Sequence, residues 1–296
     1  MILQTLTLLR NINKALFISL ALFCCGLQMQ AQTMTEDEIM AKLNEASALD
    51  NAKKTAEALD AFLLIGKNME QQRTEVEHQI YVYCQAKACM CYETLNRYEE
   101  AYLLAKKLIA GNLTEKEKKD VGHLYAVNGY LYASSFMHGN NRQSVKARTI
   151  LEEIMPYADG KVKEYALPKI SESWFFEGAE YHLSQQYDKA LTCYQNALKG
   201  YLKLGKTKDE ISVLQHIAEI KGTLYDVAGS ENAYKQALVL AKQIGKTDVL
   251  MEILKELWNL GNRIGNVQQA QTYAASIDSL VDVAADLQTK YTYYNQ

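Results

Sequence analysis

Residues 171–204 read SESWFFEGAEYHLSQQYDKALTCYQNALKGYLKL, and this stretch decides the fold. Trp174, Gly178 and Tyr181 are four and three residues apart, which places them on one face of a helix. A short turn over residues 183–186 follows, and then a second stripe with helical spacing: Tyr187, Ala190, Tyr194, Ala197 and Leu198. Two such stripes joined by a short turn predict a helical hairpin, in which small residues let the helices approach closely.

The hairpin repeats along the chain with a period of 40 residues. Tyr194 recurs as Tyr234, and Ala190 recurs as Ser230 and again as Ala270. One hairpin cannot bury both of its faces, so a fixed period of this length is typical of stacked units rather than one closed core.

Six stretches carry such stripes and predict six helical hairpins, whose starts lie about 40 and at most 49 residues apart: residues 39–68, 82–111, 122–157, 171–204, 211–244 and 251–280. Only two prolines occur in 296 residues, and no sustained apolar/polar alternation predicts strands. The expected fold is therefore all-α. We expect one continuous array, with a joint between two three-hairpin halves at residues 159–168 as the alternative. Trp258 occupies the slot held by Gly178 and Ala218, where its bulk is expected to crowd the last hairpin.

These residues resemble the tetratricopeptide repeat. Five of its seven signature positions are present in order: Trp174, Gly178, Tyr181, Ala190 and Tyr194. Glu177 stands where the family has Leu, and Leu202 stands near its closing Pro. The resemblance implies a right-handed α-α superhelix whose first helices line a concave groove that binds a protein or peptide.

The family geometry also implies which side chains face the groove. The expected groove residues are Met90, Tyr130, Ser134, Phe175, Ala179, His182, Gln215, Glu219, Thr223, Lys255, Asn259 and Arg263. The alternative is that each is an ordinary solvated or half-packed side chain. Lys255 and Asn259 have the spacing with which some family members hold a peptide's C-terminal carboxylate. Since the clamp also needs residues from two following units, this spacing is interpreted as chance.

The N-terminus indicates export. Arg10 and Lys14 precede a 13-residue apolar run, residues 15–27, which is too short for a comfortable bilayer span. With Ala31 following, residues 1–31 are expected to be a signal peptide. An uncleaved anchor is the alternative, and Phe23 before Cys24 argues against a lipoprotein.

Boundaries at the two ends of the array follow from composition. Residues 32–38 are expected to be a polar lead-in and residues 39–280 the repeat array. Residues 281–296 are expected to be a C-terminal helix that could begin a further repeat.

No catalytic constellation is apparent, so we expect no enzyme activity, no cofactor and no metal. The Gly-Lys-Thr sequences at 205–207 and 245–247 lack the upstream glycine of a phosphate-binding loop, and they are interpreted as helix caps. Four cysteines lie outside the leader and are expected to be small buried residues: Cys84, Cys89, Cys91 and Cys193. Without Arg10 and Lys14, 30 basic and 35 acidic residues leave a net charge of −5, which disfavours a nucleic-acid partner.

The expected function is that of an exported, non-enzymatic scaffold of the bacterial cell envelope that binds a protein or peptide in its groove. The runner-up is the periplasmic sensor region of a membrane-anchored histidine kinase or transcription regulator. Such a protein would continue into a membrane helix after the array.

Overall fold

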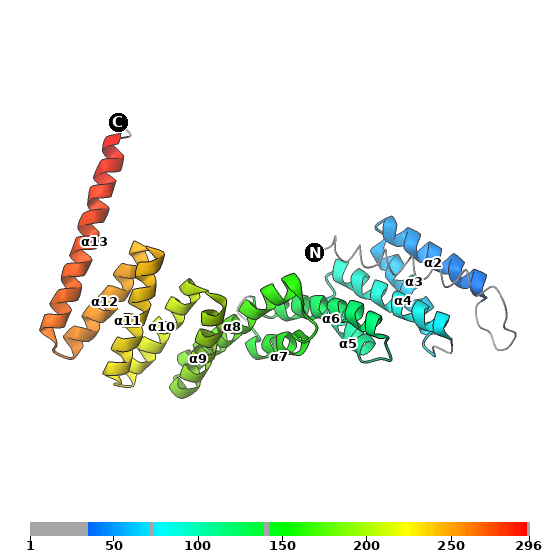
Figure 1. The fold of residues 1–296 in the computed structure, drawn as a ribbon, viewed down its shortest axis with the longest axis horizontal. Helices are drawn as coiled ribbons and strands as arrows, with labels where there is room; N and C mark the ends of the chain where they lie inside the picture. Colours follow the sequence, from blue (N-terminus) through cyan, green and yellow to red (C-terminus); the bar gives the residue numbers. More distant parts are fainter. Residues whose placement is uncertain (1–34, 72–73, 139–141, 295–296) are drawn as a thin grey trace. The chain divides into compact units, whose positions relative to one another are not determined.

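The computed structural model describes residues 35–71, 74–138 and 142–294, and every regular element in these ranges is a helix (Figure 1). The helices are α2 Glu36–Asn51, α3 Thr55–Asn68, α4 Glu75–Thr94, α5 Tyr98–Ile109, α6 Glu115–Ser135, α7 Ser144–Ile154, α8 Gly160–Leu183, α9 Tyr187–Leu204, α10 Thr207–Thr223, α11 Val227–Ile244, α12 Thr247–Arg263 and α13 Val267–Tyr294. They pair in chain order as six hairpins, α2/α3 through α12/α13, which confirms the predicted all-α array of helical hairpins.

The repeat in the sequence is also a repeat in burial. Tyr194 and Tyr234 are 0% and 7% exposed, although they lie 40 residues apart. The small residues of the next slot, Ala190, Ser230 and Ala270, are 0–2% exposed. Ser230 is the one polar member, and its hydroxyl donates a hydrogen bond of 2.8 Å to the carbonyl oxygen of Ala218. Two successive periods therefore bury the same aromatic residue, and three bury a small residue at the next slot.

The turn inside each hairpin repeats as well. A residue in the left-handed backbone region lies just after the first helix in five hairpins: Lys53, Asn96, Gln185, Tyr225 and Gly265. In each case the following amide donates to a carbonyl five residues back, as Asp226 does to Lys221 at 2.8 Å. This bond satisfies carbonyls that the helix end leaves free. The turn therefore fixes the direction in which the second helix returns.

The starts of the first helices differ along the chain. In the first three hairpins, Thr35, Thr74 and Thr114 each form a capping box with the Glu three residues later. Ahead of α10 and α12, Gly205 and Gly245 adopt φ of 62° and 65° and end the preceding helix. These glycines are helix caps, as the sequence predicted.

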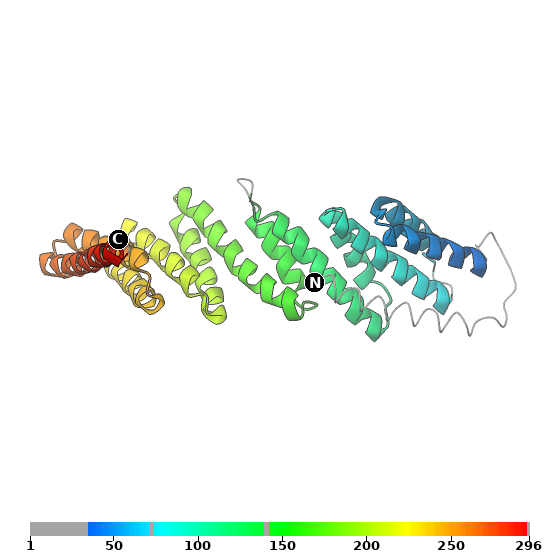
Figure 2. The ribbon, with the colours of Figure 1, turned by 90° about the horizontal axis from the view of Figure 1, so that it is seen from above.

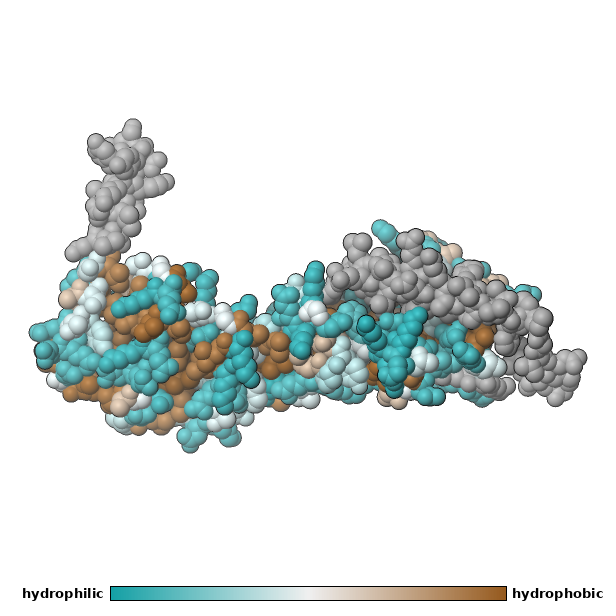
Figure 3. All heavy atoms as spheres, in the orientation of Figure 1, coloured by the Kyte–Doolittle hydropathy of each residue, from teal (hydrophilic) through white to brown (hydrophobic). Residues whose placement is uncertain are grey.

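The chain divides into two compact units. Of the described residues, those from Thr35 to Arg142 and those from 149 to 166 form unit 1, and residues 143–148 and 167–294 form unit 2. Unit 1 buries Phe62, Ile80 and their neighbours, and unit 2 buries Ile211, Leu257 and their neighbours. Within each unit, successive helices lie side by side (Figure 2). The described surface of each unit mixes hydrophilic and hydrophobic side chains on the side that Figure 3 shows.

Helix α8 begins eleven residues earlier than the hairpin expected from Ser171, and Pro168 lies inside it. Proline removes one backbone donor and normally ends a helix. The turn that contains Pro168 is nevertheless packed, because Ala166 and Ser171 are both at least 97% buried. The change from unit 1 to unit 2 also falls in this helix, after Ala166.

Two tyrosines of unit 1 share one carboxylate. Tyr102 of α5 stacks on Tyr125 of α6, with ring centroids 5.5 Å apart. Their hydroxyls donate to the two carboxylate oxygens of Glu153, at 2.8 Å from Tyr102 and 2.6 Å from Tyr125. Lys106 approaches the same carboxylate to 2.7 Å. Tyrosine is suited to this position because its ring fills the helix interface while its hydroxyl reaches a partner.

Three details of the expected organisation differ from the structure. Residues 36–38, part of the expected polar lead-in, form the first turn of α2, because the Thr35 capping box starts the helix there. Residues 281–294 are helical, as expected, but they continue α13 without a break at residue 280. Trp258 does not crowd the last hairpin: its side chain is 41% exposed, and Gly261 instead makes the close approach to Ala270.

The expected signal peptide, residues 1–31, lies outside the described residues. Among the helices that are described, none combines the length and apolar character needed to cross a bilayer.

Candidate functional site

The candidate site lies in unit 2, on the first helices of its three hairpins, α8, α10 and α12. His182 of α8 lies beside His216 of α10, with ring centroids 6.1 Å apart. Arg263 of α12 extends toward α10, where its guanidinium would lie 3.2 Å from a Cβ placed on Gly222. Consecutive first helices therefore present neighbouring side chains. We name this surface the first-helix face and define it by Phe175, His182, Gln215, His216, Glu219, Lys255, Asn259 and Arg263.

His216 lies at the centre of a cluster of rings on this face. Its ring stacks on Tyr194 of α9, with centroids 5.3 Å apart and planes 8° from parallel. Phe175 of α8 contacts the same ring at 5.4 Å. Aromatic neighbours from two other helices thus hold the imidazole in one orientation, which is the arrangement a binding residue needs.

The acid–base state of His216 follows from this packing. Burial lowers the pKa of His216, and this effect exceeds the opposing effect of the Glu219 carboxylate, whose Oε2 lies 3.6 Å from Nδ1. The nearby His182 lowers the pKa further. The neutral imidazole therefore predominates near neutral pH.

His216 was absent from the expected groove residues, although its neighbour Gln215 was among them. The signal in the sequence is the pair His216 and Glu219, which at three residues apart lie on one side of a helix. His182 lies one hairpin earlier, and the turn between helices brings it to the same place. That last step depends on the hairpin geometry and could not be obtained from the spacing alone.

The other expected groove residues fall into two groups. In unit 2, Lys255, Asn259 and Arg263 are exposed along α12, and Gln215 is half-buried on α10. In unit 1, Tyr130 packs on Tyr165 with ring centroids 6.3 Å apart. The Ser134 hydroxyl, also in unit 1, is buried without a hydrogen-bond partner. Met90, Ala179 and Thr223 range from half-buried to exposed.

Glu177, the departure from the repeat signature, has a structural partner in unit 2. Its Oε2 lies 2.7 Å from Nη2 of Arg148, and both side chains are nearly buried, at 12% and 9% exposed. The Arg148 guanidinium also lies 3.4 Å from the ring centroid of Trp174. An ion pair replaces the leucine that the signature expects at this position.

The four cysteines are buried free thiols, as expected for small interface residues. Burial raises the pKa of Cys84 to about 12 and the pKa values of Cys91 and Cys193 to about 11. Since the thiolate is the reactive form, these cysteines are poor nucleophiles at neutral pH.

The fold and the repeated packing define a class: the chain is a helical-repeat protein built from tetratricopeptide-like hairpins. No protein-family model matches it, and no curated protein matches it.

Several solved structures are similar, all at low sequence identity. Aspartyl phosphate phosphatase F from Bacillus subtilis has a TM-score of 0.42 at 11% identity, over 88% of this chain and 78% of that chain. BtubC from P. vanneervenii has a TM-score of 0.38 at 10% identity, over 78% and 92%. The C-terminal part of a TPR repeat-containing protein from Cytophaga hutchinsonii has a TM-score of 0.35 at 13% identity, over 80% and 94%.

Proposed function

We propose that this protein is a non-enzymatic scaffold that binds a protein or peptide along the first-helix face of unit 2. The observation that carries the proposal is the arrangement of this face, on which ring-bearing and charged side chains from consecutive first helices lie next to one another. Phe175 and His216 form its aromatic part, and Lys255 and Arg263 form its basic part.

The chemistry of the face favours a peptide-like partner. Aromatic side chains held by neighbouring rings contribute apolar contact area at little entropic cost. Lys255, Asn259 and Arg263 are exposed donors spaced four residues apart along α12. Such a row can hydrogen-bond carbonyl or carboxylate groups of a partner. We therefore expect the partner segment to be acidic, with apolar side chains that meet Phe175 and His216.

A matched pair of double variants tests this proposal. Lys255→Ala with Asn259→Ala removes one lysine and one amide from the first-helix face. Gln195→Ala with Lys199→Ala removes one amide and one lysine, also four apart, from the exposed side of α9. In pull-downs from an extract of the producing cell, we expect the α12 double variant to lose the partner and the α9 double variant to retain it. Equal recovery by both would refute the proposal for this face.

We further propose that the protein is exported to the cell envelope, where this partner would also be found. The support is the basic, then apolar, then small-residue order of residues 1–31. Fractionation of the producing cell, followed by N-terminal sequencing of the mature chain, tests this point. A chain that starts after Ala31 and lies outside the cytoplasm is expected. An intact Met1 in the cytoplasmic fraction would contradict the proposal.

A further inference from the structure

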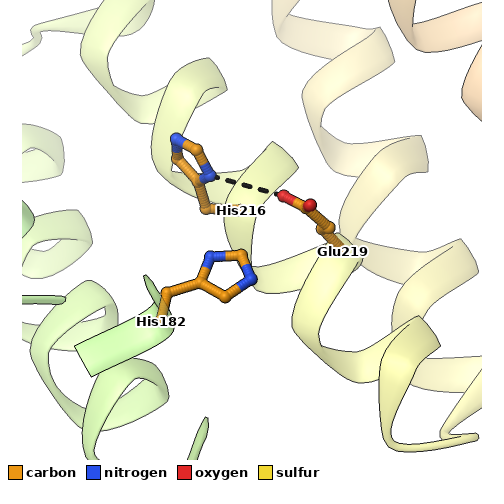
Figure 4. Close-up of side chains that lie close together, drawn as sticks. All are labelled: His182, His216 and Glu219. Atoms are coloured by element: carbon orange, nitrogen blue, oxygen red, sulfur yellow. Dashed lines mark ion pairs between the residues drawn. The ribbon is translucent and has the colours of Figure 1, made fainter. Parts of the chain in front are cut away.

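Three potential metal ligands converge on the first-helix face (Figure 4). His182 comes from the end of α8, whereas His216 and Glu219 come from successive turns of α10. One ligand atom from each residue lies within 4.8 Å of the other two. We infer that His182, His216 and Glu219 form a binding site for a divalent transition-metal ion of the zinc class.

The polar groups at this place are incompletely satisfied. Nδ1 of His216 is buried and has no hydrogen-bond partner, since Oε2 of Glu219 lies 3.6 Å away. The hydroxyl of Tyr194, whose ring stacks on His216, is also buried without a partner. Buried polar atoms in folded proteins are nearly always paired, so two unpaired atoms around one ring require an explanation. An ion bound to His216 would give its unpaired Nδ1 atom a partner.

The donor types select the kind of ion. Two imidazole nitrogens and one carboxylate oxygen suit zinc and its first-row neighbours, whereas calcium and magnesium prefer oxygen ligands alone. Bonds of roughly 2.0–2.2 Å in a tetrahedral site require ligand atoms about 3.3 Å apart. His216 Nδ1 and Glu219 Oε2 are already close to that separation.

The remaining adjustment falls mainly on Glu219, whose side chain is 57% exposed. The half-buried His182 ring lies against Tyr187, with ring centroids 6.0 Å apart. His216, in contrast, is held by Tyr194 and Phe175. The exposed Glu219 carboxylate can therefore adjust toward an ion that the two imidazole rings hold.

An ion at this site would link two neighbouring hairpins. His182 belongs to the α8/α9 hairpin, and the other two ligands belong to the α10/α11 hairpin. An ion that binds only the folded chain would therefore stabilise the packing of one hairpin on the next. Three protein ligands also leave a fourth coordination position for water or an incoming donor. The inference does not depend on the proposed partner, because the three ligands all belong to this chain.

The test uses the full chain without an affinity tag, first stripped with a chelator and then titrated with Zn²⁺ by calorimetry. One equivalent of saturable zinc binding is expected, together with a rise in the thermal unfolding temperature. Co²⁺ serves as a spectroscopic probe, because a site with imidazole and carboxylate ligands gives visible absorption bands on binding. Binding of clearly less than one equivalent of Zn²⁺ would overturn the inference.

Three variants locate the site. Glu219→Gln keeps the shape of an exposed side chain, and His182→Ala removes a half-buried ring. Each variant is expected to weaken zinc binding by at least about 10-fold, because even the loss of a residue that only supports a ligand typically weakens metal binding by that much. The control is His123→Ala in unit 1. His123 pairs with Asp159 at 3.0 Å and, among the described residues, belongs to no group of three clustered ligands. This control is expected to bind zinc as the unaltered chain does.

Two measurements on these variants, of folding and of zinc affinity, decide whether the three residues bind the ion. Circular dichroism in the presence of chelator establishes that each variant folds, and Glu219→Gln remains a valid test if His182→Ala does not fold. Zinc affinity that is unchanged in Glu219→Gln, or reduced equally in His123→Ala, would show that the ion binds elsewhere and would overturn the inference.

Discussion

Arg148 and Glu177 form an ion pair inside unit 2, with Nη2 of the arginine 2.7 Å from Oε2 of the glutamate. Replacing Arg148 with Met alone leaves the Glu177 carboxylate buried without its partner. Breaking one side of a buried ion pair typically costs about 3–5 kcal/mol, so this variant is expected to lose that much free energy of unfolding. Adding Glu177→Leu, the residue that the repeat signature expects, should restore most of the loss. Urea unfolding of the two single variants and the double variant measures the coupling.

An ion pair with more solvent exposure is the control for that cycle. Lys235 and Glu231 pair on α11, where their side chains are 52% and 23% exposed. Surface pairs contribute about 0–1 kcal/mol, so Lys235→Met should change the unfolding free energy by no more than that. A loss in Arg148→Met as small as the loss in Lys235→Met would contradict the role assigned to the buried pair.

The turns predict a stabilising substitution. Tyr225 adopts φ of 61° and is 90% exposed, so its side chain strains the backbone while packing against little. The left-handed conformation costs a non-glycine residue about 1–2 kcal/mol, part of which is offset by the entropy of glycine in the unfolded chain. Tyr225→Gly should therefore raise the unfolding free energy by roughly 0.5–1 kcal/mol. The reverse change at the equivalent turn, Gly265→Ala at φ of 72°, should lower stability. Thermal denaturation of both variants checks the opposite signs.

Glu153 is predicted to make the stability of unit 1 depend on pH. Burial alone would raise the pKa of Glu153, but hydrogen bonds from Lys106, Tyr125 and Tyr102 outweigh burial and hold its pKa below the ordinary value. A carboxyl group whose pKa is lowered on folding contributes stability that is complete above its unfolded pKa, about 4.3. The contribution is lost as the pH falls through the lower folded value.

Substitution separates this contribution from others. Glu153→Gln should reduce the unfolding free energy at pH 7 by about 1–3 kcal/mol, because charged hydrogen bonds are lost. The difference from the unaltered chain should shrink near pH 3, where the native carboxyl group is also becoming neutral. The adjacent Glu152→Gln, on an exposed position, should have little effect at either pH. A deficit in Glu153→Gln that is the same at both pH values would contradict the assignment.

The sequence predicts features that depend on residues close together in the chain better than it predicts contacts between different hairpins. Spacings of three and four residues predict the stripes of each helix, and the 40-residue period predicts that Tyr194 and Tyr234 are buried alike. Those features depend on local backbone geometry. The partner of Glu177 could not be predicted, because Arg148 comes from another hairpin and no spacing connects them. His216 escaped notice for the same reason: its role depends on rings contributed by α8 and α9.

The first-helix face of unit 2 is the surface proposed to hold a protein partner. Photo-crosslinking tests it most directly, with a photoreactive phenylalanine placed in turn at Asn259 of α12, Gln215 of α10 and Lys199 of α9, followed by irradiation in the producing cell. One protein should be captured from both Asn259 and Gln215, and it should not be captured from Lys199. Capture from Lys199 as strong as from the first-helix face, or no adduct at either face position, would contradict it.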